Sequence, residues 1–346
     1  MNEEKKKISF IINPISGTQD KEQILNLIDE RLDREKYKKE VVYTEHAGDA
    51  TNIATRKAKE GTDAIIAIGG DGTVNEIARA LVHTETTLGI IPCGSGNGLA
   101  RHLQIPMDSK RAIKIINEGI TDLIDYGKIN DVPFFCTCGV GFDAFVSLKF
   151  AKAGKRGPLT YLEKTLLEGL KYQPETYELE TENSTTKYKA FLIACGNASQ
   201  YGNNAYITPQ ATLTDGLLDV TILEPFTVLD VPSLAFQLFN KTINQNSRIK
   251  TFQCQTLRIH RAKPGVVHYD GDPMMTGEDI EIKIIEKGLR VIVPSNVEKS
   301  SNMFQKAHVY INDLKLFNEA IVDDISQKNK LILNKGKEQI KKLTKS

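Results

Sequence analysis

The sequence predicts a fold in two parts: a doubly wound parallel β-sheet with helices on both faces, followed by an antiparallel β-sandwich. Strand and helix patterns alternate along about the first third of the 346 residues. Within this part, Ala64–Ile68 is short and wholly apolar, as expected of a central parallel strand covered on both faces. From about Asp125 onward, most segments are short and strand-like, and turn residues separate them.

The elements of the first part follow from apolar periodicity and from the turn residues between the apolar runs. Five apolar side chains recur at helical spacing between Ile24 and Leu32, and the Asn13-Pro14 pair ends the strand before them. In chain order, the pattern predicts a strand at 8–12, a helix at 24–32, a strand at 41–44, a helix at 48–59, a strand at 64–68, a helix at 73–81, a strand at 88–92 and a helix at 97–103.

The second part reads mostly as short strands. They are expected at 134–138, 177–180, 188–195, 218–223, 256–260, 266–269, 280–285 and 291–293, with helices at 159–172 and 231–239. Beyond Pro294 no strand pattern remains; 304–325 is expected to be helical, and the lysine-rich end to be a solvated helix or a weak contact with anionic lipid. We therefore predict a first domain at 1–125, a sandwich domain at 126–295 and a C-terminal tail at 296–346 that packs back on the first domain.

The composition is that of a soluble globular protein, with 40% hydrophobic residues and a formal net charge of +1. Because this charge provides no basic footprint, we expect no nucleic-acid partner. The apolar runs are too short for a signal core or a spanning helix. We expect a cytoplasmic protein with peripheral membrane contact, and we leave a homodimer open. The five cysteines lack metal or redox spacing and are expected to be free, buried thiols.

Two glycine clusters follow successive predicted strands. Gly69–Glu76 comes directly after one strand, and Pro92–Gly98 comes directly after the next. Glycines let the backbone approach a phosphate closely, and the helix that follows adds the positive end of its dipole. Thr73, Ser95 and Asn97 can add side-chain donors. The sequence thus predicts a phosphate-binding edge, the alternative being two tight strand-to-helix turns.

Common nucleotide motifs do not describe these clusters. None of the Gly-Lys pairs is followed by Ser or Thr, as a Walker A loop requires, and Leu99 occupies the third glycine position of a dinucleotide fingerprint. Asp71 lies inside the first cluster, where a carboxylate would repel phosphate unless a cation intervenes. We predict that Asp71 holds Mg²⁺. The alternative for Asp71 is a helix N-cap.

At these residues the chain resembles the diacylglycerol kinase catalytic-domain superfamily, which includes bacterial diacylglycerol kinases, YegS-like lipid kinases, and sphingosine and ceramide kinases. The matching motifs run in family order across about residues 8 to 295. They are Asn13–Gly17, Gly69–Glu76, Pro92–Arg101, Gly139–Ala144, Asp215–Asp219 and Tyr269–Pro273.

The resemblance implies an NAD-kinase-like and diacylglycerol-kinase-like ATP domain, with a sandwich domain that carries the lipid site. It implies a metal near Thr212, Asp215 and Leu217, and a catalytic base in the Asp270-Gly271-Asp272 segment. Together with the glycine clusters, it gives a predicted nucleotide site that comprises Asn13, Thr44, Gly69, Gly70, Asp71, Gly72, Thr73, Asn75, Gly94, Ser95, Gly96 and Asn97.

Two departures from the family pattern matter. Asp272 stands where the family usually has Glu, so the base is left open between Asp272 and Asp270, and a polar hairpin turn is the alternative for both. The sequence Gly94–Asn97 resembles the corresponding loop of sphingosine kinases, and this resemblance favours a sphingoid-type acceptor. Asp215 and Asp219 have an alternative as polar residues beside a strand. His102 and His268 are expected to be surface or structural histidines.

The predicted function is an ATP- and Mg²⁺-dependent lipid kinase that transfers the γ-phosphate to the hydroxyl of diacylglycerol, a sphingoid base or a related lipid at a membrane surface. An NAD-kinase-like enzyme is the first alternative, because NAD kinases share the Gly-Gly-Asp-Gly-Thr loop. The second is a nucleotide-binding regulator without catalysis, which the shorter Asp272 keeps open.

Overall fold

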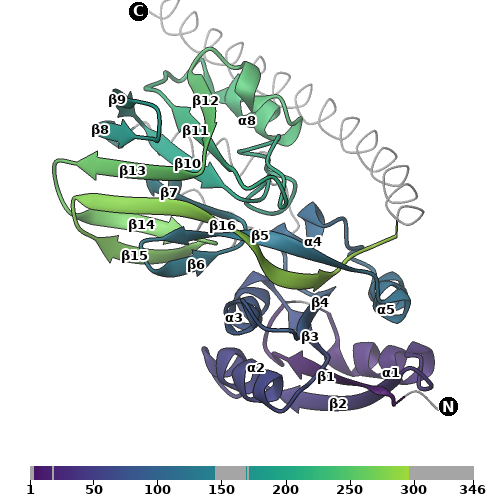
Figure 1. Cartoon of the computed structure of the whole chain (residues 1–346). Helices are drawn as coiled ribbons and strands as arrows, with labels where there is room; N and C mark the ends of the chain where they lie inside the picture. The colour runs from purple at the N-terminus through teal and green to yellow at the C-terminus, as the bar shows by residue number, and fades with distance from the viewer. Residues whose placement is uncertain (1–3, 18, 145–168, 170, 296–346) are drawn as a thin grey trace, which may run out of the picture. The chain divides into compact units, whose positions relative to one another are not determined.

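The computed structural model of the chain describes residues 4–17, 19–144, 169 and 171–295 (Figure 1). Most of the predicted helix at 159–172 lies outside the described residues. So do the predicted helix at 304–325 and the lysine-rich end, as well as the whole predicted tail domain from 296 onward.

A parallel sheet with helices on both faces forms the first part, as predicted. Its strands lie in the order β2-β1-β3-β4. They are β1 (Lys6–Ile12), β2 (Tyr37–Tyr43), β3 (Ala64–Gly69) and β4 (Thr87–Pro92). Helices α1 (Lys21–Arg31) and α5 (Ser109–Glu118) pack together on one face, while α2 (Asp49–Lys59) and α3 (Asp71–Leu81) pack on the other (Figure 1). Helix α5 was not anticipated from the sequence.

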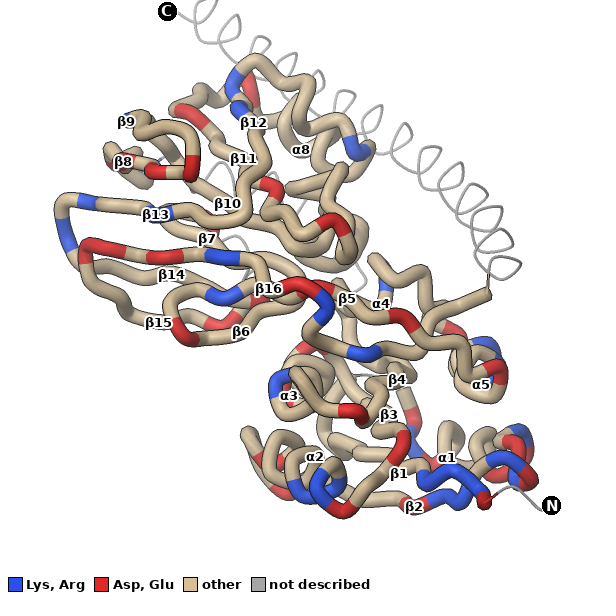
Figure 2. Tube along the Cα trace, viewed as in Figure 1, with Lys and Arg blue, Asp and Glu red and all other residues tan. Residues whose placement is uncertain are grey.

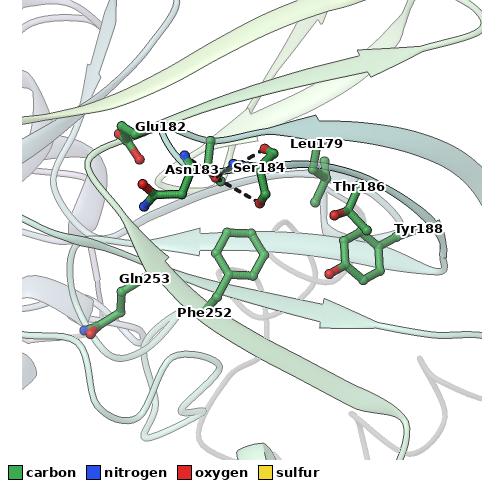
Figure 3. A pocket seen from close by; sticks show the side chains of 9 residues that line it. Leu179, Glu182, Asn183, Ser184, Thr186, Tyr188, Phe252 and Gln253 are labelled. Atoms are coloured by element: carbon green, nitrogen blue, oxygen red, sulfur yellow. Dashed lines mark hydrogen bonds between the residues drawn. The ribbon is translucent and has the colours of Figure 1, made fainter.

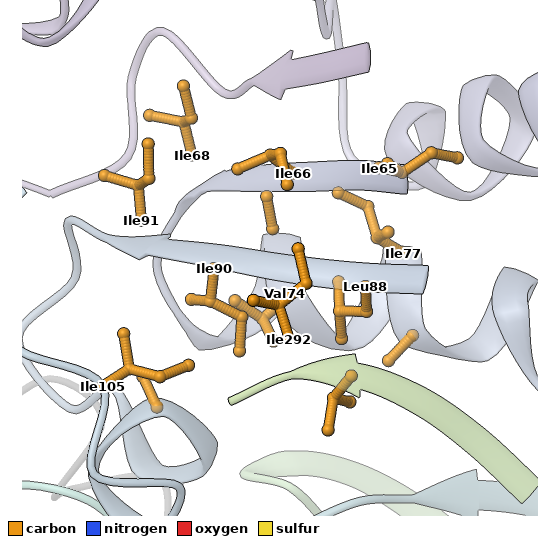
Figure 4. Packing of buried hydrophobic residues seen from close by; sticks show 14 of the residues in the cluster. Ile65, Ile66, Ile68, Val74, Ile77, Leu88, Ile90, Ile91, Ile105 and Ile292 are labelled. Carbon is orange, nitrogen blue, oxygen red and sulfur yellow. The ribbon is translucent and has the colours of Figure 1, made fainter. Parts of the chain in front are cut away.

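The core of this part is built from aliphatic side chains on both faces of β3 and β4. Every residue of these two strands is buried, which explains their continuous apolar sequence. Ile65, Ile66 and Ile77 pack with Leu88 and with Ile292, which comes from the far end of the described chain (Figure 4).

The sheet does not end at β4. Strand β16 (Asp279–Ile292) pairs with β4 in parallel at Val291 and Leu88, and antiparallel strands extend the sheet to ten in all. These are β5 (Thr121–Ile129), β6 (Val132–Phe134), β8 (Glu175–Glu180), β9 (Thr185–Ala190) and β13 (Thr256–Arg261). Strand β5 runs through residue 125, where the predicted boundary between the first two domains lies. The boundaries of the three domains stay a prediction.

A second, six-stranded antiparallel sheet faces the antiparallel half of the first sheet and completes the predicted sandwich. Its order is β12-β11-β10-β7-β14-β15. The strands are β7 (Thr137–Gly141), β10 (Leu192–Gly196), β11 (Leu218–Leu223), β12 (Ile249–Cys254), β14 (Gly265–Tyr269) and β15 (Asp272–Thr276). Val140, Ile193 and Val220 meet Leu179 and Ile282 in the core between the sheets.

Predicted strands are wrong in three places, and each error comes from a local bend. The predicted strand at 134–138 spans the end of β6 and the start of β7, which belong to different sheets. The predicted strand at 188–195 is two strands in different sheets, because the chain changes sheets at Phe191, whose N–H bonds Leu223 O at 2.7 Å. The predicted strands at 280–285 and 291–293 are one strand, β16, whose register shifts between Ile285 and Leu289. Lys287, with φ of 51°, lies in this bulge.

Helix α8 (Val231–Phe239) forms at the predicted residues and covers the outer face of the second sheet. Its buried side chains Val231, Leu234 and Leu238 pack in one cluster with Leu192 and Leu223 from that sheet. All five cysteines are free and buried, as predicted.

Candidate active site

The site begins at the edge of the sheet where the strand order reverses. In the order β2-β1-β3-β4, the chain moves from β1 to one side and then returns to the other, so β1 and β3 flank a topological switch point. Ligands of open α/β sheets bind beyond the carboxyl ends of the strands at such a point. The residues directly after β1, β3 and β4 are 13–17, 70–72 and 93–97, and they contain most of the predicted nucleotide residues. Of these, Asp71 and Gly72 are already the first residues of α3.

Glycines let these three loops pack directly on one another. A Cβ added at Gly94 would lie 2.6 Å from the Cα of Gly70, which joins the loops after β3 and β4. Gly17 has φ of +69°, and a Cβ there would lie 1.9 Å from Cys93 O, which joins the loops after β1 and β4. Any side chain at either position would force the loops apart.

The Asp71 carboxylate fixes the loop after β4. Its Oδ2 accepts the Asn97 N–H at 2.8 Å, and its Oδ1 accepts the Gly98 N–H at 2.7 Å. Asp71 thus serves the N-terminus of α4 (Gly98–His102), whereas the N-cap of its own helix α3 is Gly70. Burial raises the pKa of Asp71, and the two N–H donors oppose that shift. That Asp71 holds Mg²⁺ stays a prediction.

Asn97 and Arg101 hold the same loop from within. Asn97, at φ of 52°, accepts the Gly94 N–H through Oδ1 at 3.0 Å and donates through Nδ2 to Gly94 O at 2.6 Å. Arg101 donates from Nε to Gly96 O at 2.8 Å. The backbone of this loop is therefore shaped before any ligand binds, as a phosphate-binding backbone must be.

Two cations stand beside the loops. Lys21 donates from Nζ to Ser16 O at 2.6 Å. Burial raises the pKa of the Cys93 thiol, and the charge of Lys21 opposes that shift. Arg101 lies next to Asp71. Burial lowers the pKa of Arg101, and the negative charge of Asp71 opposes that shift. Lys21 was missed from the sequence, although it opens α1 directly after the Asn13–Gly17 motif. These cations favour an anionic ligand at this edge.

The other predicted nucleotide residues occupy this edge in different ways. Asn13 forms a turn in which its Oδ1 accepts the Ile15 N–H at 3.2 Å, and Thr73 packs on Gly69. Thr44 is buried at the end of β2, where its N–H bonds Ile12 O at 2.9 Å. Asn75 is buried on α3.

The Asp270 turn approaches the loops from the second sheet. Asp270, at φ of 51°, accepts three backbone N–H groups, from Phe135 at 2.8 Å, Cys136 at 2.7 Å and Thr137 at 3.2 Å. Burial raises the pKa of Asp270 to about 6, although these N–H groups and the charge of Arg79 oppose the shift. A carboxyl group with such a pKa can exchange a proton near neutral pH.

Cys136 lies between this turn and the glycine loops. Its N–H binds Asp270, and its Sγ would lie 3.2 Å from a Cβ added at Gly98, whose own N–H binds Asp71. Burial raises the pKa of the Cys136 thiol, and the charges of both Asp270 and Asp71 add to the shift. The structure thus brings the two predicted carboxylates to opposite sides of one residue.

Asp272 differs from Asp270 in its exposure and in its partners. Its side chain is 56% exposed, and its Oδ2 lies 3.6 Å from Arg79 Nη2 on α3. The Arg79 guanidinium also lies 5.0 Å from the centre of the Tyr269 ring. The Asp272–Arg79 pair thus joins α3 to the turn, while Asp270 is part-buried and bonded to backbone N–H groups.

A buried polar group behind the turn was missed from the sequence. His268 and Asp143 are fully buried, with His268 Nε2 at 2.5 Å from Asp143 Oδ2, and the Tyr201 hydroxyl donates to Asp143 Oδ1. Gly271 donates its N–H to His268 Nδ1 at 3.4 Å. The sequence pointed to Asp143 only through the Gly139–Ala144 motif, to which it belongs. The predicted structural role of His268 is consistent with this burial, and His102 likewise bonds Ser199 through Nδ1.

The predicted metal ligands lie on a loop before β11. Thr212 and Asp215 are exposed, and Asp215 Oδ1 accepts the Leu217 N–H at 3.1 Å. Asp125, which the sequence did not single out, anchors this loop by accepting the Gly216 N–H at 2.9 Å. Among the described residues, no three acidic, histidine or cysteine side chains gather at one point, so the loop would rely on hydroxyl and carbonyl oxygens as well.

A hollow of about 270 Å³ lies elsewhere, at the edge of the sandwich (Figure 3). Leu179, Tyr188 and Phe252 line it together with the turn at Thr181–Ser184, in which the Thr181 hydroxyl contacts the backbone of Ser184. It contains none of the predicted site residues, and Glu182 is the one carboxylate in its lining.

Comparisons with known proteins agree with this architecture. The model of the diacylglycerol kinase catalytic domain matches residues 7–129, and that of the YegS C-terminal NAD kinase beta sandwich-like domain matches residues 136–293. A diacylglycerol kinase from Mycobacterium tuberculosis is 30% identical over 260 residues, which cover 72% of this chain and 82% of that protein.

Solved structures show the same fold. A diacylglycerol kinase from Bacillus anthracis superposes with a TM-score of 0.67 at 22% identity, covering 84% of this chain and 97% of that one. An NAD kinase from Archaeoglobus fulgidus in complex with ATP superposes with a TM-score of 0.50 at 12% identity, covering 87% of this chain and 98% of that one.

Substitution of Gly94 by Ala tests the contact between the glycine loops. The new Cβ would overlap Gly70, so we expect the free energy of unfolding to fall by about 1–3 kcal/mol. Gly72→Ala is the matched control, because a Cβ at Gly72 meets no atom within 4 Å. Chemical denaturation of both variants without nucleotide makes the comparison, and equal stabilities would contradict close packing of the loops.

Substitution of Asp71 by Asn tests whether the carboxylate supports the loops. One Asp71 oxygen would become an NH₂ group that faces a backbone N–H, so we expect a loss of about 1–3 kcal/mol in the absence of nucleotide and Mg²⁺. Thermal unfolding measures this, with the exposed Asp131→Asn as control. A variant that keeps full stability but loses Mg²⁺-dependent binding would show that Asp71 acts on the ligand alone.

Proposed function

Because the chain belongs to the diacylglycerol kinase catalytic-domain family, we propose that it is an ATP- and Mg²⁺-dependent lipid kinase that transfers the γ-phosphate to a lipid hydroxyl. The family is one of phosphotransferases with an alcohol acceptor. The observation that carries the proposal is the position of Asp270, a part-buried carboxyl group with a pKa of about 6, near glycine loops held in shape by Asp71.

The triphosphate of ATP would bind along the glycine loops. Gly70 and Gly94 leave only backbone at the point of closest approach, and a Cβ at Gly72 would meet open space. Lys21 and Arg101 would balance the phosphate charge. Bound Mg²⁺ would neutralise the phosphates further, and Asp71 or the loop of Thr212, Asp215 and Leu217 offers the oxygen ligands that Mg²⁺ prefers.

We assign the base to Asp270. In its ionised form it would take the proton of the lipid hydroxyl as that oxygen bonds to the γ-phosphorus and the bond to the leaving ADP oxygen breaks. The three N–H groups from 135–137 fix its carboxylate in place. Asp272 is paired with Arg79 and half exposed, so we assign it to positioning of the turn.

The acceptor is proposed to be diacylglycerol, a sphingoid base or a related long-chain alcohol presented by a membrane. Among helices in the described part of the chain, none has the length and apolarity needed to cross a bilayer. Peripheral attachment from the cytoplasm is a separate part of the proposal. A homodimer and the absence of nucleic-acid partners stay predictions.

Labelled ATP, extracted lipid and NAD in one assay test the proposed function. We expect label in the organic phase, and mass spectrometry of that phase identifies the lipid. Label in NADP would instead support the NAD-kinase alternative, which shares the fold. ATP binding without any transfer would support the regulator and contradict the proposal.

The pH dependence of transfer tests the assignment of the base. A carboxyl group must be ionised to accept a proton, so kcat/KM should rise with pH through an apparent pKa of about 6 and level off above it. Arg79→Met removes a charge that lowers the pKa of Asp270, so the rise should move to higher pH.

Two variants separate the carboxylates. Asp270→Asn should lower kcat by about 10²-fold or more, because proton transfer by a positioned base contributes that much. Asp272→Asn should keep most of the wild-type kcat, and its kcat/KM should still rise near the same pH. The assignment is wrong if Asp272→Asn, rather than Asp270→Asn, abolishes the rise.

A further inference from the structure

Four exposed apolar residues gather on α8 and on the turn that precedes it. Val228 is 55% exposed, Leu229 is 87% exposed and Phe236 is 41% exposed, and Pro232 is exposed as well. Pro232 and Phe236 are four positions apart and so share one side of the helix, and Val228 and Leu229 lie in the turn directly before it. We call these four residues the α8 patch.

Helix α8 has apolar residues on its exposed side as well as on its buried side. Its nine residues include no charged side chain, and the tube is tan along the helix in Figure 2; Ser233 and Gln237 are its polar residues. Val231, Leu234 and Leu238 fill the side that faces the second sheet, so the α8 patch lies outside that core. Exposed apolar side chains that gather in one place commonly mark an interaction surface. The exposed side of α8 therefore calls for an apolar cover.

Residues 227–241, which include the α8 patch, contain one acid, Asp230, and one base, Lys241. Asp230 accepts the Thr227 N–H at 2.7 Å, and its Oδ2 lies 3.6 Å from Arg248 Nε. Lys241 follows the helix, with its Nζ 4.4 Å from the centre of the Tyr206 ring. An apolar surface with one paired acid and a cation at its end matches the interfacial zone of a bilayer, whose headgroups carry phosphate.

The α8 patch is connected to the proposed site through a short series of contacts. Tyr206 donates its N–H to Leu238 O at the end of α8 at 2.8 Å, and it interacts electrostatically with Arg101. Arg101 in turn holds Gly96 in the second glycine loop. The loop that contains Tyr206 also packs on Gly96 through Gly202. Direct contacts thus connect helix α8 to the loop that we propose binds the nucleotide.

We propose that the α8 patch inserts into the interfacial region of a phospholipid bilayer and thereby holds the enzyme at the surface that supplies its lipid. This inference rests on the proposed lipid-kinase function. Insertion of aliphatic side chains is an apolar interaction, so the attachment should depend only weakly on salt. Attachment through the lysine-rich end would instead weaken steeply as salt increases.

Vesicle partitioning of the full-length chain tests this inference. We expect Val228→Asp together with Leu229→Asp to lower the partition coefficient onto phosphatidylcholine–phosphatidylglycerol vesicles by about tenfold or more, at low and at high salt, since two aliphatic side chains lose their apolar environment. Met275→Asp is the matched control, because Met275 is 67% exposed on β15 and should leave partitioning unchanged. Both variants alter exposed residues, and unchanged thermal unfolding would show that both remain folded.

Activity assays connect partitioning to catalysis. The double variant should lose transfer to lipid in vesicles but keep transfer to a short-chain, water-soluble form of the same lipid. Unchanged partitioning of the double variant would overturn the inference, as would binding that salt abolishes. A wild-type dimer that the double variant converts to a monomer, with vesicle binding intact, would show that a second copy covers the α8 patch.

The partitioning assay also separates this inference from the proposed function. If the wild-type chain binds vesicles through the α8 patch but phosphorylates no lipid, the proposed function fails while the membrane surface stands. If it phosphorylates soluble lipid and the double variant binds vesicles normally, the inference fails and the kinase stands.

Discussion

Direct contact between backbone loops is the constraint on which the rest of this structure depends. At the ends of β1, β3 and β4, three loops approach more closely than any side chain allows, at Gly17 against Cys93 and at Gly70 against Gly94. Backbone N–H groups brought so close need an acceptor, and Asp71 supplies it to Asn97 and Gly98. The carboxylate that looks out of place in a phosphate loop is thus part of what gives the loop its shape.

The second half of the molecule is tied to this edge by the return of the chain. Strand β16 pairs with β4 and places Ile292 in the core of the first part, so both halves share one sheet. The opposite sheet carries the Asp270 turn, and residues 135–137 bind that turn through three N–H groups. Because Cys136 also packs on Gly98, the Asp270 turn and the glycine loops are held by one set of contacts.

The outer face of the second sheet carries both a buried polar group and an apolar cover. Asp143, His268 and Tyr201 contact one another on this face, because His268 alternates along β14 with Val267, which points into the core between the sheets. On the same face, α8 covers the sheet but leaves the α8 patch in contact with solvent. A protein whose substrate is a lipid would combine an ordered polar site with an apolar exterior at the bilayer.

The sequence by itself determined the elements and the motifs, because apolar periodicity and glycine turns are local properties. It placed β3, α8 and both glycine loops, and it named Asp71 and Asp270. Only the tertiary structure decided their partners. Asp270 and Phe135 are 135 residues apart, and their contact depends on the register of paired strands, which no local pattern records. For the same reason the sheet change at Phe191, the bulge in β16 and the Asp143–His268 pair were not predictable: each is set by contacts between segments distant in the chain.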